Sequence, residues 1–138
     1  SRGASPGNRF EPGKKPMSTM APTIIFDKNN ELFLITGSPG GSDIPAAILR
    51  VITGVIDFDL DIGEATMLPR IHKDWPYVGL EHERAVSRDT VRRLKSMGHE
   101  TEYENTIGST QSIHIINGVN YGYADLRRPN ASVSVQSN

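Results

Sequence analysis

The sequence predicts an α+β fold of layered α/β type, in which helices cover a β-sheet. Two apolar segments, 21–26 and 31–36, flank the turn cluster Asp27–Asn30 and predict an antiparallel hairpin. Large aliphatic residues recur at helical spacing across 44–56, which predicts a helix with one face on the sheet. Near the end of the chain, Asn117-Gly118 predicts a second hairpin, because this dipeptide favours a tight two-residue turn. Hairpins interleaved with amphipathic helices are typical of a layered architecture.

The first hairpin is apolar along most of both strands and does not alternate with polar residues. Such uninterrupted apolar runs are typical of strands that are covered on both sides. We therefore expect this hairpin to be buried on both faces.

A glycine loop, Gly37-Ser-Pro-Gly-Gly-Ser42, leads from the second strand into the first helix. Ser42 or Asp43 can cap that helix, and Pro45 suits its first turn. The remaining expected elements are helices at 61–67 and 88–97 and strands at 77–81, 100–105, 111–116 and 120–124.

Composition excludes several classes of function. The chain has 138 residues, which suits one domain or a piece of a larger one. Its formal charge of −1 gives no general attraction to nucleic acid or anionic membranes, and no apolar run is long enough for a membrane span. The absence of cysteine excludes disulfides, thiolate metal sites and a thiol nucleophile.

Residues 1–16 are rich in Gly, Pro and basic residues and read as an irregular segment or a cut end, whereas 129–138 form a polar tail. The domain is expected at 17–128. Its histidines lack metal-ligand spacing, so no metal site is predicted and a structural role is expected for all of them: His72, His82, His99 and His114.

Two short segments suggest acyl-transfer chemistry. Ser18 and Thr19 are adjacent hydroxyls that could hold a substrate, and the backbone N–H groups of Gly40 and Gly41 could hold a developing negative charge. No residue stands out as nucleophile. The alternatives are hydroxyls that bond their own backbone and glycines that only make a tight turn. A phosphate loop is disfavoured, because the lysine and spacing of a Walker A motif are missing.

Four blocks together resemble the C-terminal part of the small subunit of γ-glutamyltranspeptidases: PGKKPMSTMAPTII, LFLITGSPGGS, DIGEATMLPRIH and GSTQSI. The resemblance runs from about Pro12 to about Arg128. It implies an N-terminal nucleophile hydrolase fold, an αββα sandwich completed by two chains that are cut from one precursor.

The resemblance also implies an activity. Such enzymes transfer the γ-glutamyl group of glutathione and related γ-glutamyl compounds to amino acids, peptides or water through a threonine acyl-enzyme, without a cofactor. Ser18 and Thr19 match the positions that help hold the glutamyl α-carboxylate, and Gly40 and Gly41 match the oxyanion hole. Position 19 departs from the commoner serine, since threonine adds a methyl group and restricts χ1.

By the same resemblance, the nucleophilic threonine and the acidic partner of the substrate amine lie upstream of this sequence. The arginine that contacts the substrate carboxylate belongs to the large subunit. The chain alone is therefore expected to be inactive and to pair with the large subunit and the N-terminal part of the small subunit. A periplasmic, secreted or cell-surface location is implied as well.

Three alternatives remain open. A cephalosporin or glutaryl acylase, or a poly-γ-glutamate-processing relative, would share the oxyanion glycines and differ in substrate. A non-catalytic homologue would use the same domain for binding or assembly. Ser1 as an N-terminal nucleophile is disfavoured, because no family block aligns there.

Overall fold

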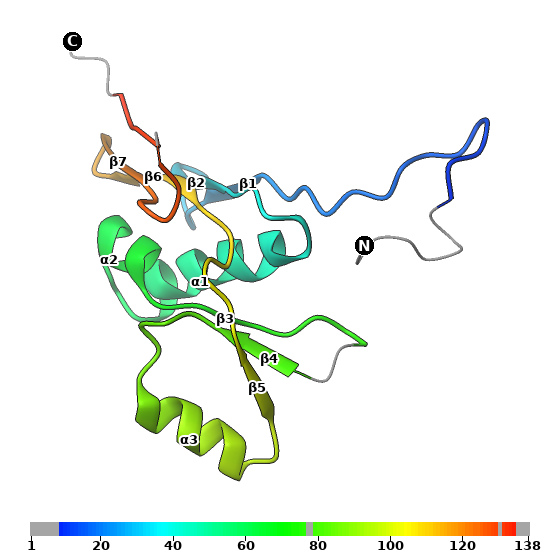
Figure 1. The fold of residues 1–138 in the computed structure, drawn as a ribbon. Coiled ribbons are helices and arrows are strands. Elements are labelled where there is room, and N and C mark those ends of the chain that lie inside the picture. Colours follow the sequence, from blue (N-terminus) through cyan, green and yellow to red (C-terminus); the bar gives the residue numbers. More distant parts are fainter. Residues whose placement is uncertain (1–8, 77–78, 130, 135–138) are drawn as a thin grey trace.

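The computed structural model describes residues 9–76, 79–129 and 131–134, which form two sheets and three α-helices (Figure 1). Sheet A has the order β1-β2-β6-β7, and sheet B has the order β3-β4-β5. The strands are β1 Thr23–Phe26, β2 Leu32–Gly37, β3 Ile71–His72, β4 Gly79–His82, β5 Glu100–Tyr103, β6 Gln111–Ile116 and β7 Val119–Ala124. The helices are the 3₁₀ turn η2 Gly41–Asp43, α1 Ile44–Asp57, α2 Ile62–Met67 and α3 Arg88–Ser96.

Helices α1 and α2 lie between the two sheets, with α3 beyond sheet B (Figure 1). The main core forms where α1 and α2 pack on sheet A. Its central residues are Leu34, Val51, Val55, Ile62 and Ala65. The helix predicted over 44–56 is thus confirmed, although Leu49 and Ile56 point away from the core and are 60% and 51% exposed.

All neighbouring strands of sheet A are antiparallel. Ile24 lies opposite Ile35, and Ile35 lies opposite Ile113, so these three side chains share one face. That face is turned away from α1, and Ile24 and Ile113 are 59% and 38% exposed. The expectation of a hairpin buried on both faces is wrong for this chain, because α1 and α2 cover only one side.

Sheet B contains a strand that the sequence did not predict. Strand β3 has two residues, too few for a periodic pattern, and pairs antiparallel with β4. Strand β4 runs parallel to β5, and α3 makes the crossover between them. Of the strand expected at 77–81, residues 77 and 78 lie outside the described residues.

The helices predicted at 61–67 and 88–97 are confirmed, each one residue shorter, because Asp61 is the N-cap of α2 and Met97 the C-cap of α3. The Ser87 hydroxyl accepts a hydrogen bond from the Thr90 N–H and caps α3. Asp61 caps α2 and forms a capping box with Glu64. Within the described part of the chain, no helix has both the length and the apolar character needed to cross a membrane.

Candidate active site

The two segments predicted to carry chemistry lie next to each other. The Thr19 hydroxyl donates a hydrogen bond of 2.7 Å to the Gly41 carbonyl, across 22 positions of sequence. The adjacent Ser18 hydroxyl accepts a 3.2 Å bond from the Met20 N–H, which fixes the turn of its own loop. The structure thus brings the predicted hydroxyls and the predicted glycines to one place, at the start of η2.

The two glycines of the loop have positive φ angles, a backbone conformation that is strained for residues with a side chain. Gly40 has a φ of 145° and Gly41 a φ of 66°, and a side chain added at Gly41 would meet nothing within 4 Å. Within the described part of the chain, the N–H of neither glycine donates a hydrogen bond to a protein acceptor. Both groups precede α1, whose amino end favours negative charge.

The GSTQSI block contacts the glycine loop and is hydrogen-bonded to it. The Ser38 hydroxyl donates to the Pro39 carbonyl at 2.7 Å and accepts from the Ser109 N–H at 2.9 Å. Gly108 lies close to both the glycine loop and α1, because a Cβ at this position would be 2.9 Å from the Ser38 hydroxyl oxygen and 2.6 Å from the Cβ of Ala47. The segment before β6 therefore orders the glycine loop.

Asp43 behaves differently from the expected helix cap. It occupies the N-cap position of α1, but its side chain makes no capping hydrogen bond there. The carboxylate is turned instead toward His72, with Oδ1 3.7 Å from Nε2. Burial and the negative charges of Glu81, Asp74 and Glu104 raise the pKa of Asp43, although His72 opposes this.

A buried ionic network, which the sequence did not reveal, joins the end of α2 to the segments that follow β4, precede β6 and follow β7. Arg70 is 1% exposed and bonds Asp125 at 2.8 Å, as well as the carbonyls of Ile107 and Thr66. Arg127 bonds both carboxylate oxygens of Glu83, at 2.7 and 2.8 Å. Burial opposes ionisation of Glu83, but hydrogen bonds from Arg127 and from backbone N–H groups outweigh it and hold its pKa below the ordinary value.

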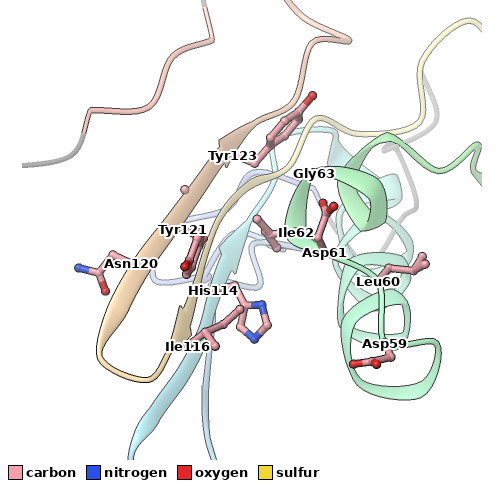
Figure 2. Close-up of a pocket in the computed structure, with 11 residues that line it drawn as sticks. Asp59, Leu60, Asp61, Ile62, Gly63, His114, Ile116, Asn120, Tyr121 and Tyr123 are labelled. Atoms are coloured by element: carbon pink, nitrogen blue, oxygen red, sulfur yellow. The ribbon is translucent and has the colours of Figure 1, made fainter.

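A separate cleft of about 790 Å³ lies between the α1–α2 connection and the β6–β7 hairpin (Figure 2). It sits at the far end of α1 from the glycine loop, and a helix of 14 residues is about 20 Å long. Buried His114 lines this cleft, and its Nε2 lacks a hydrogen-bond partner in the structure. Desolvation lowers the pKa of His114, because burial disfavours the charged ring.

Comparison with known proteins decides the family. The family model described as gamma-glutamyltranspeptidase matches residues 2–135. The chain belongs to the γ-glutamyltranspeptidase family. A glutathione hydrolase proenzyme from Escherichia coli K12 is 40% identical over 121 residues, which are 87% of this chain and 21% of that protein.

Solved structures of γ-glutamyltranspeptidases confirm the fold. A point mutant of the Helicobacter pylori enzyme gives a TM-score of 0.83 at 37% identity, covering 91% of this chain and 69% of that one. The Pseudomonas nitroreducens enzyme in complex with L-DON gives 0.84 at 28% identity, covering 96% and 70%. The α+β fold is therefore that of the N-terminal nucleophile hydrolases. The chain spans about a fifth of the length of the curated relatives that it matches.

Proposed function

We propose that this chain supplies the oxyanion hole and part of the substrate pocket of a γ-glutamyltranspeptidase that acts on glutathione and related γ-glutamyl compounds. The bond from Thr19 to the Gly41 carbonyl carries the proposal, because it holds the hydroxyl loop against the glycine loop. The family membership supports it, and the whole protein would work outside the cytoplasm, in the periplasm, at the surface or as a secreted enzyme.

In the proposed reaction, a threonine hydroxyl from outside this chain attacks the γ-carbonyl carbon of the substrate. The carbonyl oxygen becomes an oxyanion, and the N–H groups of Gly40 and Gly41 donate to it. The α-amine of the threonine takes the proton of its hydroxyl during the attack and passes it to the leaving nitrogen. Collapse of the intermediate then breaks the C–N bond, releases the amine and leaves a γ-glutamyl ester on the threonine. Water or an acceptor amine then attacks the ester and releases the product.

The two hydroxyls have different parts in this scheme. A threonine hydroxyl carries one proton, and that of Thr19 is already donated to the Gly41 carbonyl. The Ser18 hydroxyl accepts from Met20 and keeps its own proton for another acceptor. We therefore assign Ser18 as the donor to the substrate α-carboxylate and Thr19 as a positioning residue for the glycine loop.

The first test compares this chain with the enzyme assembled from it and the rest of the protein. Only the assembled enzyme should release p-nitroaniline from γ-glutamyl-p-nitroanilide, because the chain brings no attacking threonine. Release by the purified chain alone would contradict the proposal that the attacking threonine comes from another part of the protein. An inactive assembled enzyme, shown to be folded, would contradict the activity itself.

The second test separates Ser18 from Thr19 in the assembled enzyme. Ser18→Ala removes a charge-assisted hydrogen bond of about 1.5–3 kcal/mol and should raise KM at least about tenfold. Thr19→Val keeps the shape and releases the glycine loop, so it should lower kcat, and Thr19→Ser should restore it. Thr23→Val serves as the control, because it removes a similar hydroxyl bond, to Ala21, outside both loops. Equal effects at all three positions would refute the assignment.

A further inference from the structure

The chain contains a second cluster of chemically capable side chains, next to the glycine loop but distinct from it. Asp43, His72 and Glu81 each offer a ligand atom, and these atoms all lie within 4.8 Å of one another. They come from three elements, η2, β3 and β4. His72 and Glu81 are direct cross-strand partners in sheet B, and η2 brings Asp43 to them.

His72 is the observation that points to a ligand. Its side chain is only 10% exposed, and its Nε2 is buried without a hydrogen-bond partner. Asp74 Oδ1 is 3.2 Å away and Asp43 Oδ1 is 3.7 Å away, but neither meets the nitrogen with hydrogen-bond geometry. A buried polar atom left this way destabilises the fold unless something binds it.

We propose that Asp43, His72 and Glu81 form a binding site for a divalent transition metal, with Zn²⁺ as the best fit and a water molecule as the fourth ligand. Zinc–nitrogen and zinc–oxygen bonds of about 2.0–2.2 Å at a tetrahedral angle place neighbouring ligand atoms roughly 3.3 Å apart. The separation of 3.7 Å from His72 Nε2 to Asp43 Oδ1 lies close to that spacing.

The donor set selects among metals. One imidazole nitrogen with several carboxylates suits Zn²⁺, Co²⁺ or Mn²⁺, whereas Ca²⁺ and Mg²⁺ prefer oxygen ligands alone. Carboxylates surround a single imidazole here, and a dication would offset their mutual repulsion. This site could not be predicted from the sequence, because its donors are spread over positions 43, 72 and 81.

The site would have a mechanical consequence for the glycine loop. Asp43 is the last residue of η2 and follows Gly41 by two positions. A metal held by Asp43 and by two strands of sheet B would tie the carboxyl end of the glycine loop to that sheet. The metal would therefore have a structural role and would take no part in the acyl-transfer step.

The experiment measures Zn²⁺ binding to the whole chain by titration calorimetry at neutral pH, with Co²⁺ as a spectroscopic substitute. We expect one equivalent to bind, the Tm to rise on addition of Zn²⁺, and the Co²⁺ complex to show the visible absorption of a four-coordinate site. Asp43→Asn and His72→Gln should each weaken binding at least tenfold and abolish the rise in Tm. His99→Gln, which changes an imidazole elsewhere, should leave both unchanged.

Two results would overturn the proposal. One is the absence of saturable Zn²⁺ binding by the wild-type chain, which would leave the cluster as a set of contacts between charged side chains. The other is binding that persists in both Asp43→Asn and His72→Gln, which would place the metal at other residues. Circular dichroism of each variant without metal checks that it is folded, and Asp43→Asn changes a partly exposed side chain that the core does not need.

Discussion

At the scale of single residues, two glycines share one backbone conformation and differ in position. Gly41 has a φ of 66° and Gly118 a φ of 76°, and neither would bring a new Cβ within 4 Å of other atoms. An alanine at either position therefore costs only the strain of the left-handed conformation, roughly 1–2 kcal/mol. Gly118 is the turn of the β6–β7 hairpin, whereas Gly41 belongs to the proposed oxyanion hole.

This pair allows a matched test in the assembled enzyme. Gly41→Ala keeps its N–H but strains the left-handed backbone, which turns that N–H away from the substrate oxygen. The kcat should therefore fall, by at most the roughly 100-fold that loss of one oxyanion donor causes. Gly118→Ala should lower stability by a similar amount and leave kcat nearly unchanged. Steady-state kinetics and thermal unfolding of both variants measure this. A similar small loss of kcat in both would mean that the glycines serve only the turn.

His114 predicts how stability depends on pH. Its pKa is lowered in the folded chain by burial, so the folded state resists a proton that the unfolded state accepts. Its contribution to stability is therefore present above the unfolded value of about 6.5 and is lost as the pH falls below it. The slope is at most about 1.4 kcal/mol per pH unit.

His114→Gln should remove this part of the pH dependence. Denaturant unfolding at pH 7.5 and 5.0 should show a larger loss of stability in the wild type than in the variant. The same loss in both proteins would mean that other groups cause the acid sensitivity.

At the scale of elements, we expect substitutions in the network around Arg70 to lower the free energy of unfolding more than substitutions at surface ion pairs do. Asp125→Asn keeps the shape but leaves Arg70 as a buried charge with less compensation, which typically costs about 3–5 kcal/mol. The control is Asp89→Asn, which breaks the ion pair with Arg92 on the surface, where side chains are 79% and 85% exposed. That change should cost less than about 1 kcal/mol. Comparable losses in urea unfolding would contradict the role of the network.

Elements with local signals could be predicted from the sequence, and those with distant partners could not. Helix α2 was predictable because Asp61 and Glu64 cap it within one turn. Arg70, in contrast, bonds partners that are 37, 40 and 55 positions away, and no pattern around Pro69-Arg70-Ile71 reveals them. For the same reason the hydroxyl and glycine loops could be nominated as a site, while the bond that joins them appears only in the structure.

At the scale of the whole molecule, the described residues cover one face of sheet A only at its β7 edge, where Val133 lies against Gly122. Ile24, Ile35 and Ile113 are cross-strand partners and form a stripe across β1, β2 and β6, on the face opposite the core residue Leu34, which packs against α1. In an αββα sandwich this side of the sheet faces a second sheet. The stripe is therefore where we expect the rest of the protein to dock, and where the isolated chain should associate with itself.

The double variant Ile24→Thr and Ile113→Thr tests this expectation without weakening the strands, because threonine is also β-branched. Each isoleucine contributes up to about 1.5–3 kcal/mol when it is buried in an interface, so self-association should weaken at least about tenfold. Sedimentation velocity at several concentrations measures the shift toward monomer. Met97→Gln removes an apolar side chain that is 66% exposed at the end of α3 and should leave the distribution unchanged. If the double variant and the wild type sediment alike, the stripe is not the docking face. The next surface to examine is then the exposed side of α1, because Leu49 and Ile56 are about as exposed as Ile24.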